Sequence, residues 1–207
     1  INDRVRDILR VKFLVGLFDH PYQIDLKGAD EEVEKAANEE IALQASRESI
    51  VLLKNDKNIL PLDASGIQKI AVCGPNADEH SYALTHYGPL AVEVTSVLKG
   101  IQEKMKDKAD VLYTKGCDLV DANWPESELI DYPLTDEEQK EIDKAVSQAK
   151  QADVAIVVLG GGQRTCGENK SRSSLDLPGR QLDLLKAVVA TGKPVAVSYT
   201  HLRAHET

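Results

Sequence analysis

The feature that most constrains the fold is an alternation of short apolar segments with longer amphipathic segments between residues 69 and 197. The short segments are residues 69–75, 110–113, 153–159 and 194–197. Residues 153–159 are rich in β-branched side chains, which is typical of a strand buried on both faces of a sheet. Strands that alternate with helices predict a parallel sheet, because each helix returns the chain to the edge where the next strand begins.

Amphipathic segments separate the predicted strands and indicate the helices that cover the sheet. The first helix is expected over residues 94–105, the second begins with a capping box formed by Thr135 and Glu138, and the third follows Pro178 and Gly179. The side chains expected to face the sheet are Val97, Leu98 and Ile101, then Ile142, Ala145, Val146 and Ala149, then Leu182, Leu185 and Val189. The predicted fold class is α/β, a mostly parallel sheet flanked by helices, or α/β sandwich.

Before the first strand the pattern is helical. Residues 4–17 carry apolar side chains at helical spacing, and a turn containing Gly16 and Pro21 follows. Asp30 is placed to cap a further helix that runs through residues 33–45. This helix leads into the apolar run at residues 50–53, which we expect to dock on a core.

Composition excludes two classes of partner. Among 207 residues, 42% are hydrophobic and 29% are charged, and the formal net charge is −9. We expect no nucleic-acid partner, because phosphate binding draws its affinity from clustered Lys and Arg, and the sequence has no basic patch. The longest apolar runs, such as residues 154–159, fall short of the roughly 20 residues that span a bilayer, so we expect no membrane partner.

We also expect no metal and no cofactor. The last strand is expected to end at Val197, and residues 198–207 continue neither a strand nor an amphipathic helix. We therefore expect 198–207 to be a non-native tail, and we give its His201 and His205 pair, spaced four residues apart, no metal role. The cysteines lie too far apart for a CxxC motif and are Cys73, Cys117 and Cys166.

Ligands of parallel α/β sheets bind beyond the carboxyl ends of the strands, where two loops qualify. In residues 74–78, Asn76 and Asp78 could touch a ligand, but their pattern favours ordinary turn chemistry. Residues 160–178 are rich in glycine, yet Thr165 stands where a Gly-x-Gly-x-x-Gly motif needs its third glycine. The Walker pattern fails as well, because Glu168 follows Gly167 in place of lysine.

This second loop holds Glu168 between Arg164, Lys170 and Arg172. A glutamate serves as a general acid when its surroundings raise its pKa, whereas close basic side chains lower it. The residues alone leave open a solvated loop glutamate with no catalytic role. A glycosidase also needs a second carboxyl group, and nothing in this stretch identifies one.

Three segments, taken in order, resemble glycoside hydrolase family 3, the β-glucosidases and β-xylosidases. They are residues 47–55 (RESIVLLKN) with Leu60-Pro61-Leu62, residues 70–78 (IAVCGPNAD) and residues 168–181 (ENKSRSSLDLPGRQ). The resemblance runs from about residue 1 to residue 197, and residues 12–22 resemble the last helix of the family's barrel domain with the linker that leaves it.

The resemblance implies a domain organisation and partners. Residues 1–20 would be the C-terminal end of a (β/α)8-type barrel, residues 21–44 a linker and helix, and residues 45–197 an incomplete α/β sandwich domain. The rest of the barrel, which carries the family's aspartate nucleophile, would lie outside this chain. The implied partners are that barrel, in the same polypeptide, and a small-molecule carbohydrate substrate.

The resemblance also implies a function, that of a fragment of a retaining β-glycosidase. Such a glycoside hydrolase removes terminal β-linked glucose or xylose from oligosaccharides or glycosides. Glu168 would be its general acid/base, with Asp176 and Glu126 as lesser candidates because the loop varies in length among family members. Without the nucleophile, the isolated chain is expected to be inactive.

Two residues are candidates for sugar contacts. Arg164 could line a sugar subsite, although an arginine near a glutamate is more often its ionic partner. Trp124, in the irregular loop at residues 117–133, could stack on a sugar face or could anchor that loop. The competing function is a free-standing α/β ligand-binding or regulatory domain that uses the loop at Gly160 for a small anionic or sugar ligand.

Overall fold

The computed structural model describes residues 1–21, 25–33, 35–80, 94–128, 130 and 132–200. The chain divides into two compact units, Ile1–Lys54 and Asn55–Thr207. The sandwich that we expected over residues 45–197 therefore falls mostly in the second unit.

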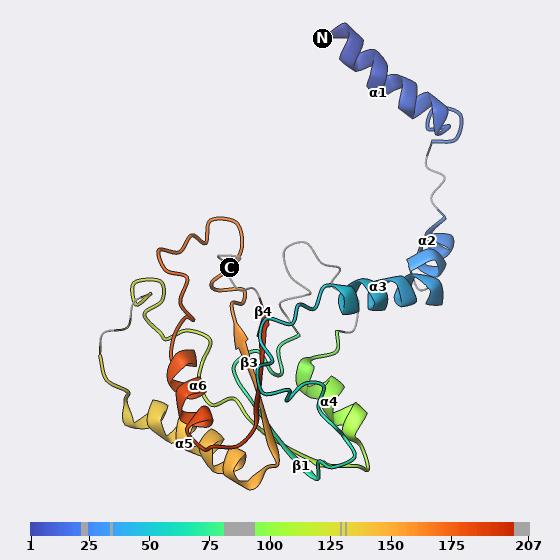
Figure 1. Ribbon diagram of the computed structural model, residues 1–207. Helices are drawn as coiled ribbons and strands as arrows, with labels where there is room; N and C mark the ends of the chain where they lie inside the picture. The colour runs from blue at the N-terminus through green and yellow to red at the C-terminus, as the bar shows by residue number, and fades with distance from the viewer. Residues whose placement is uncertain (22–24, 34, 81–93, 129, 131, 201–207) are drawn as a thin grey trace. The chain divides into compact units, whose positions relative to one another are not determined.

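In the second unit, four parallel strands form a sheet in the order β2-β1-β3-β4 (Figure 1). The strands are β1 (Lys69–Cys73), β2 (Asp110–Thr114), β3 (Val154–Gly160) and β4 (Val195–Thr200). The helices between them are α4 (Val97–Met105), α5 (Asp136–Gln151) and α6 (Gln181–Val189). The predicted α/β class with a mostly parallel sheet is confirmed.

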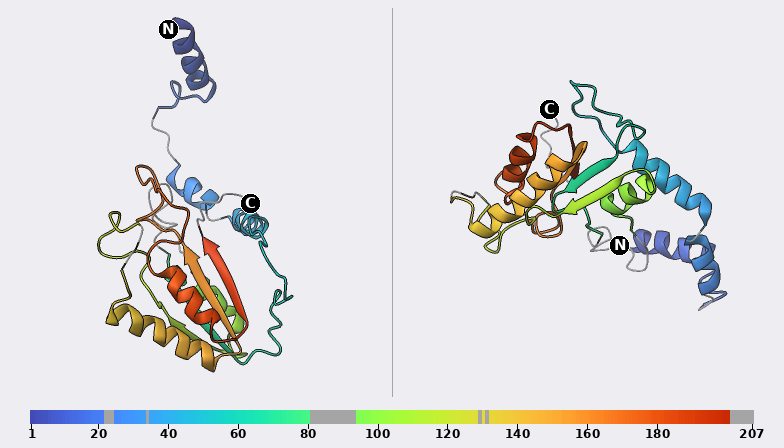
Figure 2. Two further views of the ribbon diagram at one scale, coloured as in Figure 1. Left: turned by 60° about the vertical axis from the view of Figure 1, so that its left-hand side comes forward. Right: turned by 90° about the horizontal axis from the view of Figure 1, so that it is seen from below.

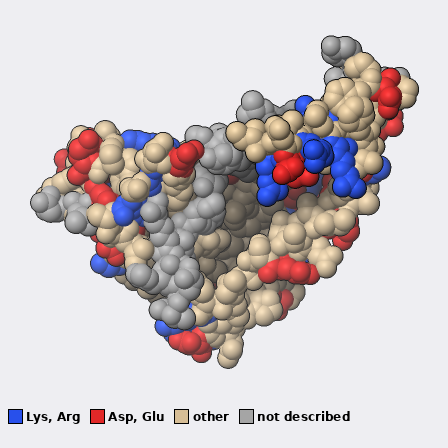
Figure 3. Space-filling view, turned by 90° about the horizontal axis from the view of Figure 1, so that it is seen from above, with Lys and Arg blue, Asp and Glu red and all other residues tan. Residues whose placement is uncertain are grey.

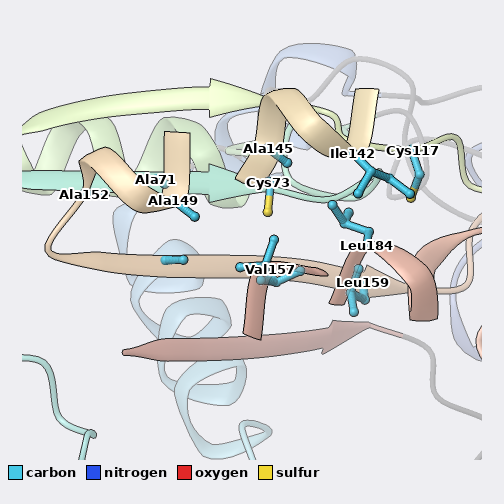
Figure 4. Close-up of a cluster of buried hydrophobic side chains, with 12 residues drawn as sticks. Ala71, Cys73, Cys117, Ile142, Ala145, Ala149, Ala152, Val157, Leu159 and Leu184 are labelled. Atoms are coloured by element: carbon cyan, nitrogen blue, oxygen red, sulfur yellow. The ribbon is translucent and has the colours of Figure 1, made fainter. Parts of the chain in front are cut away.

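Different helices cover the two faces of the sheet, with α4 on one side and α5 and α6 on the other (Figure 2). Successive side chains of a strand point to opposite faces, so alternate residues of β1 and β3 enter different hydrophobic clusters. The cluster under α4 contains Ile70, Val72, Ala77, Leu98, Met105, Val154 and Val158. The cluster under α5 and α6 (Figure 4) includes Ala71, Cys73, Ile142, Ala145, Ala149, Val157, Leu159 and Leu184. Burying each large aliphatic side chain contributes about 1.5–3 kcal/mol to folding.

Helix α5 matches its prediction closely. Both hydrogen bonds of the capping box are present, because Thr135 Oγ1 accepts from the Glu138 N–H and a Glu138 carboxylate oxygen accepts from the Thr135 N–H. The helix buries Ile142, Ala145 and Ala149, as expected.

The predicted inner faces of the other two helices need correction. In α6, Leu182 and Val189 are exposed, whereas Leu184 and Val188 are buried. The predicted Leu185 does pack against the core cluster, partly buried. The buried side chain of Gln181 sets the rotation of the helix, whose fully buried positions are 181, 184 and 188. Helix α4 begins at Val97, not at residue 94, and Val97 is exposed.

The last strand extends further than the sequence predicts. β4 continues to Thr200, and its residues 198–200 pair with residues 158–160 of β3. The neighbouring strand supplies a complete backbone ladder at this point, so the loss of apolar character after Val197 does not end the strand. Residues 201–207 lie outside the described residues.

The first unit contains the helices α1 (Asn2–Leu14), α2 (Leu26–Val33) and α3 (Ala36–Glu48). The single helix predicted through residues 33–45 is thus two helices, and Asp30 lies within α2 and does not cap a helix. Every residue of α1 is exposed, including Leu9 and Phe13. The run at residues 50–53 is exposed as well, and its docking on a core stays a prediction.

Charges of both signs lie interspersed on the surface drawn in Figure 3. On α1, for example, Arg4 pairs with Asp7 and Arg6 with Asp3, each at 3.4 Å between nitrogen and oxygen. Within the described parts of the chain, no helix has the length and apolar character needed to cross a membrane.

Candidate active-site loops

The candidate site lies at the carboxyl edge of the sheet. β3 ends there at Gly160 and enters the glycine loop (residues 160–178), and β2 leads into the acidic loop (residues 117–133) at the same edge. Hydrogen bonds between residues 40 to 44 positions apart join the two loops. The two loops therefore lie side by side, although neither forms a helix or strand in its described part beyond Gly160.

The side chain of Gln181 fixes the beginning of the glycine loop. Its Oε1 accepts a hydrogen bond from the Gly160 N–H at 2.8 Å, and its Nε2 donates to the Gly160 carbonyl at 2.9 Å and to the Leu119 carbonyl at 3.2 Å. This amide is fully buried. It both accepts from and donates to the Gly160 backbone, as a residue of a neighbouring strand would. Leaving such buried groups unpaired would cost about 1–3 kcal/mol each.

The next two glycines are held in the same way. The Asn76 side-chain amide donates to the Gly161 carbonyl at 2.9 Å, and Thr165 Oγ1 accepts from the Gly162 N–H at 3.0 Å. Both polar side chains are buried. The start of the glycine loop is thus held by hydrogen bonds from buried side chains rather than by apolar packing.

The loop at residues 74–78 has a structural role, as its turn chemistry indicates. Gly74 has a φ of +116°, and a Cβ atom there would lie 2.0 Å from the Val158 carbonyl oxygen, so the backbone can pass β3 only at a glycine. Asp78 accepts a hydrogen bond from the hydroxyl of Ser96, the N-cap of α4, at 2.8 Å. Together with the Asn76 bond, these contacts join the ends of β1 and β3 to the start of α4.

Glu168 lies at the tip of the glycine loop. Its neighbours Gly167 and Asn169 both have positive φ, +134° and +61°, and the Lys170 N–H closes the turn on the Gly167 carbonyl at 3.2 Å. Glu168 is exposed, and the Lys170 ammonium donates to the Gln163 carbonyl. The backbone therefore presents this carboxyl group on a tight turn that protrudes from the loop.

Arg172, another basic neighbour of Glu168 in sequence, pairs with Glu128 of the acidic loop. The Arg172 Nε–H donates to Glu128 Oε1 at 3.1 Å, and the two side chains are only 5% and 16% exposed. The same carboxylate accepts from the Ser173 N–H and hydroxyl at 2.9 and 2.8 Å, and from the Ser174 N–H at 3.1 Å. We call this set of contacts the Glu128 clamp.

The clamp keeps its carboxylate ionised. The Ser173 backbone hydrogen bond, together with those from Ser174, the Ser173 hydroxyl and Arg172, outweighs desolvation and lowers the pKa of Glu128 to about 2. Sequence reasoning missed Glu128, because its partners lie about 45 positions away and no motif spacing connects them. The cluster of a basic residue and two serines at residues 172–174 is the only signal that an acidic partner was needed.

Trp124 and Arg164 also join the two loops. The indole N–H of Trp124 donates to the Arg164 carbonyl at 3.1 Å, and Arg164 Nη1 donates to the Asp121 carbonyl at 3.4 Å. The guanidinium carbon of Arg172 lies 5.7 Å from the centre of the Trp124 ring. Trp124 is half-buried and Arg164 is exposed, so the anchoring contacts leave part of each side chain accessible.

The two lesser candidates are in different surroundings. Asp176 is exposed, and its carboxylate accepts from the Ser174 hydroxyl at 3.0 Å while its carbonyl accepts from Arg172 at 2.6 Å. Glu126 is exposed on the acidic loop, two residues before Glu128.

A cleft of about 510 Å³ opens between the acidic loop and the first turns of α5. Arg180 lines it and pairs with Glu138 at 3.0 Å, and its guanidinium carbon lies 4.7 Å from the centre of the Tyr132 ring. Glu168 is not among the residues that line this cleft, so the protruding turn and the cleft are separate features.

Among the residues that the structure describes, no group of three or more His, Cys, Asp or Glu side chains is arranged to hold a metal ion. His201 and His205 lie outside those residues. Cys73 and Cys117 are buried, and burial raises the pKa of each thiol to about 12. Both thiols are therefore protonated at neutral pH and unsuited to nucleophilic attack.

Comparisons with known proteins agree on one family. The glycosyl hydrolase family 3 C-terminal domain matches residues 50–207. A β-xylosidase of Formosa agariphila is 39% identical over 95% of this chain and 26% of its own length. A periplasmic β-glucosidase of Salmonella typhimurium is 35% identical over 95% of this chain and 27% of its own length.

Solved structures give the same result. A β-glucosidase involved in saponin metabolism from intestinal bacteria superposes with a TM-score of 0.79 at 31% identity, over 97% of this chain and 29% of its own. A β-glucosidase from Listeria innocua in complex with glucose superposes with a TM-score of 0.69 at 27% identity, over 92% of this chain and 23% of its own. The chain thus spans about a quarter of the length of these relatives.

Proposed function

The chain belongs to glycosyl hydrolase family 3 as a C-terminal domain, and from this premise we propose that it is part of a retaining β-glycosidase that removes terminal β-linked glucose or xylose. Its contribution is the acid/base loop, with Glu168 as general acid and base. The observation that carries the proposal is the protruding turn at Gly167–Asn169, which presents an exposed carboxyl group beyond the carboxyl ends of the parallel strands.

The mechanism follows from the chemistry that two carboxyl groups can perform. An aspartate of the barrel domain attacks the anomeric carbon while Glu168 protonates the departing oxygen, and a covalent glycosyl-enzyme forms. Glu168 then deprotonates the water that releases the sugar. In retaining enzymes the two carboxyl groups stand about 5–5.5 Å apart, which the barrel and the loop would have to achieve together.

The exposed position of Glu168 is compatible with a site that the barrel domain and the glycine loop form together. A carboxyl group becomes a good acid near neutral pH when burial raises its pKa. The sugar and the barrel wall would exclude water from Glu168 only when they close around it, so its acid function belongs to the assembled enzyme. We accordingly propose that the isolated chain has no hydrolase activity.

The proposal includes two sugar contacts and a domain assignment. Arg164 and Trp124 keep accessible surface on the same pair of loops as Glu168, and a guanidinium and an indole are both suited to binding a sugar. Residues 1–20 are proposed as the end of the barrel, which is supported by the exposed apolar side chains of α1, such as Leu9 and Phe13. The family match gives no support to the alternative of a free-standing binding domain.

The test is a Glu168→Ala variant of the full-length parent enzyme, assayed on aryl β-glycosides. We expect kcat/KM to fall by about 100- to 10,000-fold for poor leaving groups, which need protonation, and far less for 2,4-dinitrophenolate, which does not. Glu126→Ala and Asp176→Ala serve as comparisons. If Glu168→Ala lowers kcat/KM equally for all leaving groups, Glu168 is not the general acid. If the selective loss on poor leaving groups appears in Glu126→Ala or Asp176→Ala, that residue is the general acid.

A further inference from the structure

The limb of the glycine loop after Glu168 is joined to the acidic loop through one carboxylate at residues 172–174. Four donor groups on three consecutive residues, Arg172, Ser173 and Ser174, converge on Glu128. Arg172 also donates to the Asp176 carbonyl at 2.6 Å, which ties the limb to itself. Because this limb contains no helix or strand, side-chain contacts of this kind determine where it runs.

The clamp consists of polar contacts between two irregular loops. Glu128 and Arg172 lie 44 positions apart in the chain, and the hydrophobic clusters of the sheet are formed by other, apolar side chains. The effect of the clamp is local, because it fixes one loop against another at the carboxyl edge of the sheet.

The turn that carries Glu168 is consequently held on both sides. On one side, Thr165 binds the Gly162 N–H and the Trp124 indole binds the Arg164 carbonyl. On the other side, the Glu128 clamp begins at Arg172. Only a few residues separate these two attachments, and a short segment with both ends fixed has little conformational freedom.

We propose that Glu128 is a positioning residue for Glu168. By holding the second limb of the glycine loop, it places the Glu168 carboxyl group at the distance from the departing oxygen that proton transfer requires. The inference rests on the proposed acid/base role of Glu168. General acid catalysis is sensitive to such placement, and a displacement of about 1 Å at the reacting centre can cost about 100-fold in rate. Glu128 itself remains an acceptor for its four donors and transfers no proton.

The primary test is Glu128→Gln in the full-length parent enzyme. Glutamine keeps the size of the side chain, but it removes the negative charge and turns one acceptor into a donor that faces the Ser173 N–H. We expect kcat/KM on aryl β-glycosides with poor leaving groups to fall at least about tenfold through kcat rather than KM. We expect kcat/KM on 2,4-dinitrophenyl glycosides to be largely retained, because their leaving group needs no acid. Glu103→Gln, the same change at an exposed position of α4, is the matched control and should leave the kinetics unchanged.

Two further measurements keep the outcome decisive. Glu128→Asp retains the charge and should restore part of the lost rate if Glu128 acts by holding the loop. Hydrogen exchange should show faster exchange at the Ser173 and Ser174 amides in Glu128→Gln than in wild type. The positioning role is overturned if hydrogen exchange at these amides rises in Glu128→Gln while the dependence of its rate on the leaving group stays that of wild type. It is also overturned if Glu128→Gln lowers the rate equally for all substrates.

Glu168→Ala, measured in the same series, separates this inference from the function on which it rests. If Glu168→Ala lacks the leaving-group signature, the acid/base assignment fails and the positioning role fails with it. If Glu168→Ala shows the signature and Glu128→Gln does not, the acid/base role stands and only the role of Glu128 is overturned.

Discussion

Glu128 and Glu168 are the same residue type on neighbouring loops at one edge of one sheet, and their surroundings give them opposite properties. Glu128 is 16% exposed and accepts hydrogen bonds from four donor groups, which lower its pKa to about 2. Glu168 stands exposed on a turn between two residues with positive φ. Four donor groups of the glycine loop thus converge on the carboxylate that joins the two loops, whereas the carboxyl group on the turn is exposed.

The largest effect on stability is expected at Gln181, whose side chain binds Gly160 of the glycine loop and Leu119, which lies in the acidic loop. Gln181→Leu should lower the free energy of unfolding by about 3 kcal/mol, because a side chain of similar size would leave the Gly160 N–H and carbonyl unpaired in the interior. Chemical denaturation of the 207-residue chain measures this loss. A variant as stable as wild type would show that Gly160 finds other partners.

The clamp itself should contribute somewhat less. Glu128→Ala is expected to destabilise the second unit by about 2 kcal/mol, because the largely buried Arg172 guanidinium and the Ser173 and Ser174 N–H groups lose their acceptor. Denaturation midpoints of wild type and variant give the difference. Equal midpoints would mean that water replaces Glu128 as the acceptor for these groups.

The stabilisation that Glu128 provides should depend on pH. The pKa of Glu128 falls from 4.5 in the unfolded chain to about 2 in the folded chain, so its stabilisation is complete above pH 4.5 and is lost as the pH falls toward 2. The gap in unfolding free energy between wild type and Glu128→Gln should therefore be constant from pH 5 to 7 and close below pH 4. A gap that does not depend on pH would contradict the ionised clamp.

The smallest effect is expected at the turn. Glu168→Ala should change the free energy of unfolding by less than about 0.5 kcal/mol, because an exposed side chain on a protruding turn contributes little to the core. Thermal unfolding of this variant beside Glu128→Ala measures the contrast directly. A loss at position 168 as large as that at position 128 would remove the distinction between the two carboxylates.

Much of the fold could be predicted because each strand contains a short apolar segment and α5 combines a capping box with an inner stripe of Ile142, Ala145 and Ala149. The errors lie where a polar contact overrides that pattern. Gln181 is polar by type but buried by its bonds to Gly160, which rotates α6 away from the predicted face. β4 runs past Val197 because its neighbour β3 continues to Gly160.

The candidate site was less accessible to sequence reasoning. The residues alone single out Glu168 as the carboxylate of the glycine-rich loop but leave a catalytic and a solvated glutamate both open, and the resemblance of residues 168–181 to a family favours the catalytic role. Glu128 was not identified at all, because the contact with Arg172 spans two irregular loops and no periodicity relates them. Such loop-to-loop contacts are set by the tertiary fold, which a single sequence does not display.

The most direct test of the central claim uses the Glu168→Ala parent enzyme with sodium azide and an activated aryl β-glycoside, with the product identified by NMR. If Glu168 is the acid/base of a retaining enzyme, azide needs no base, attacks the glycosyl-enzyme in place of water, restores turnover and gives the β-glycosyl azide. Turnover that azide does not change, with free sugar as the only product, would contradict the account.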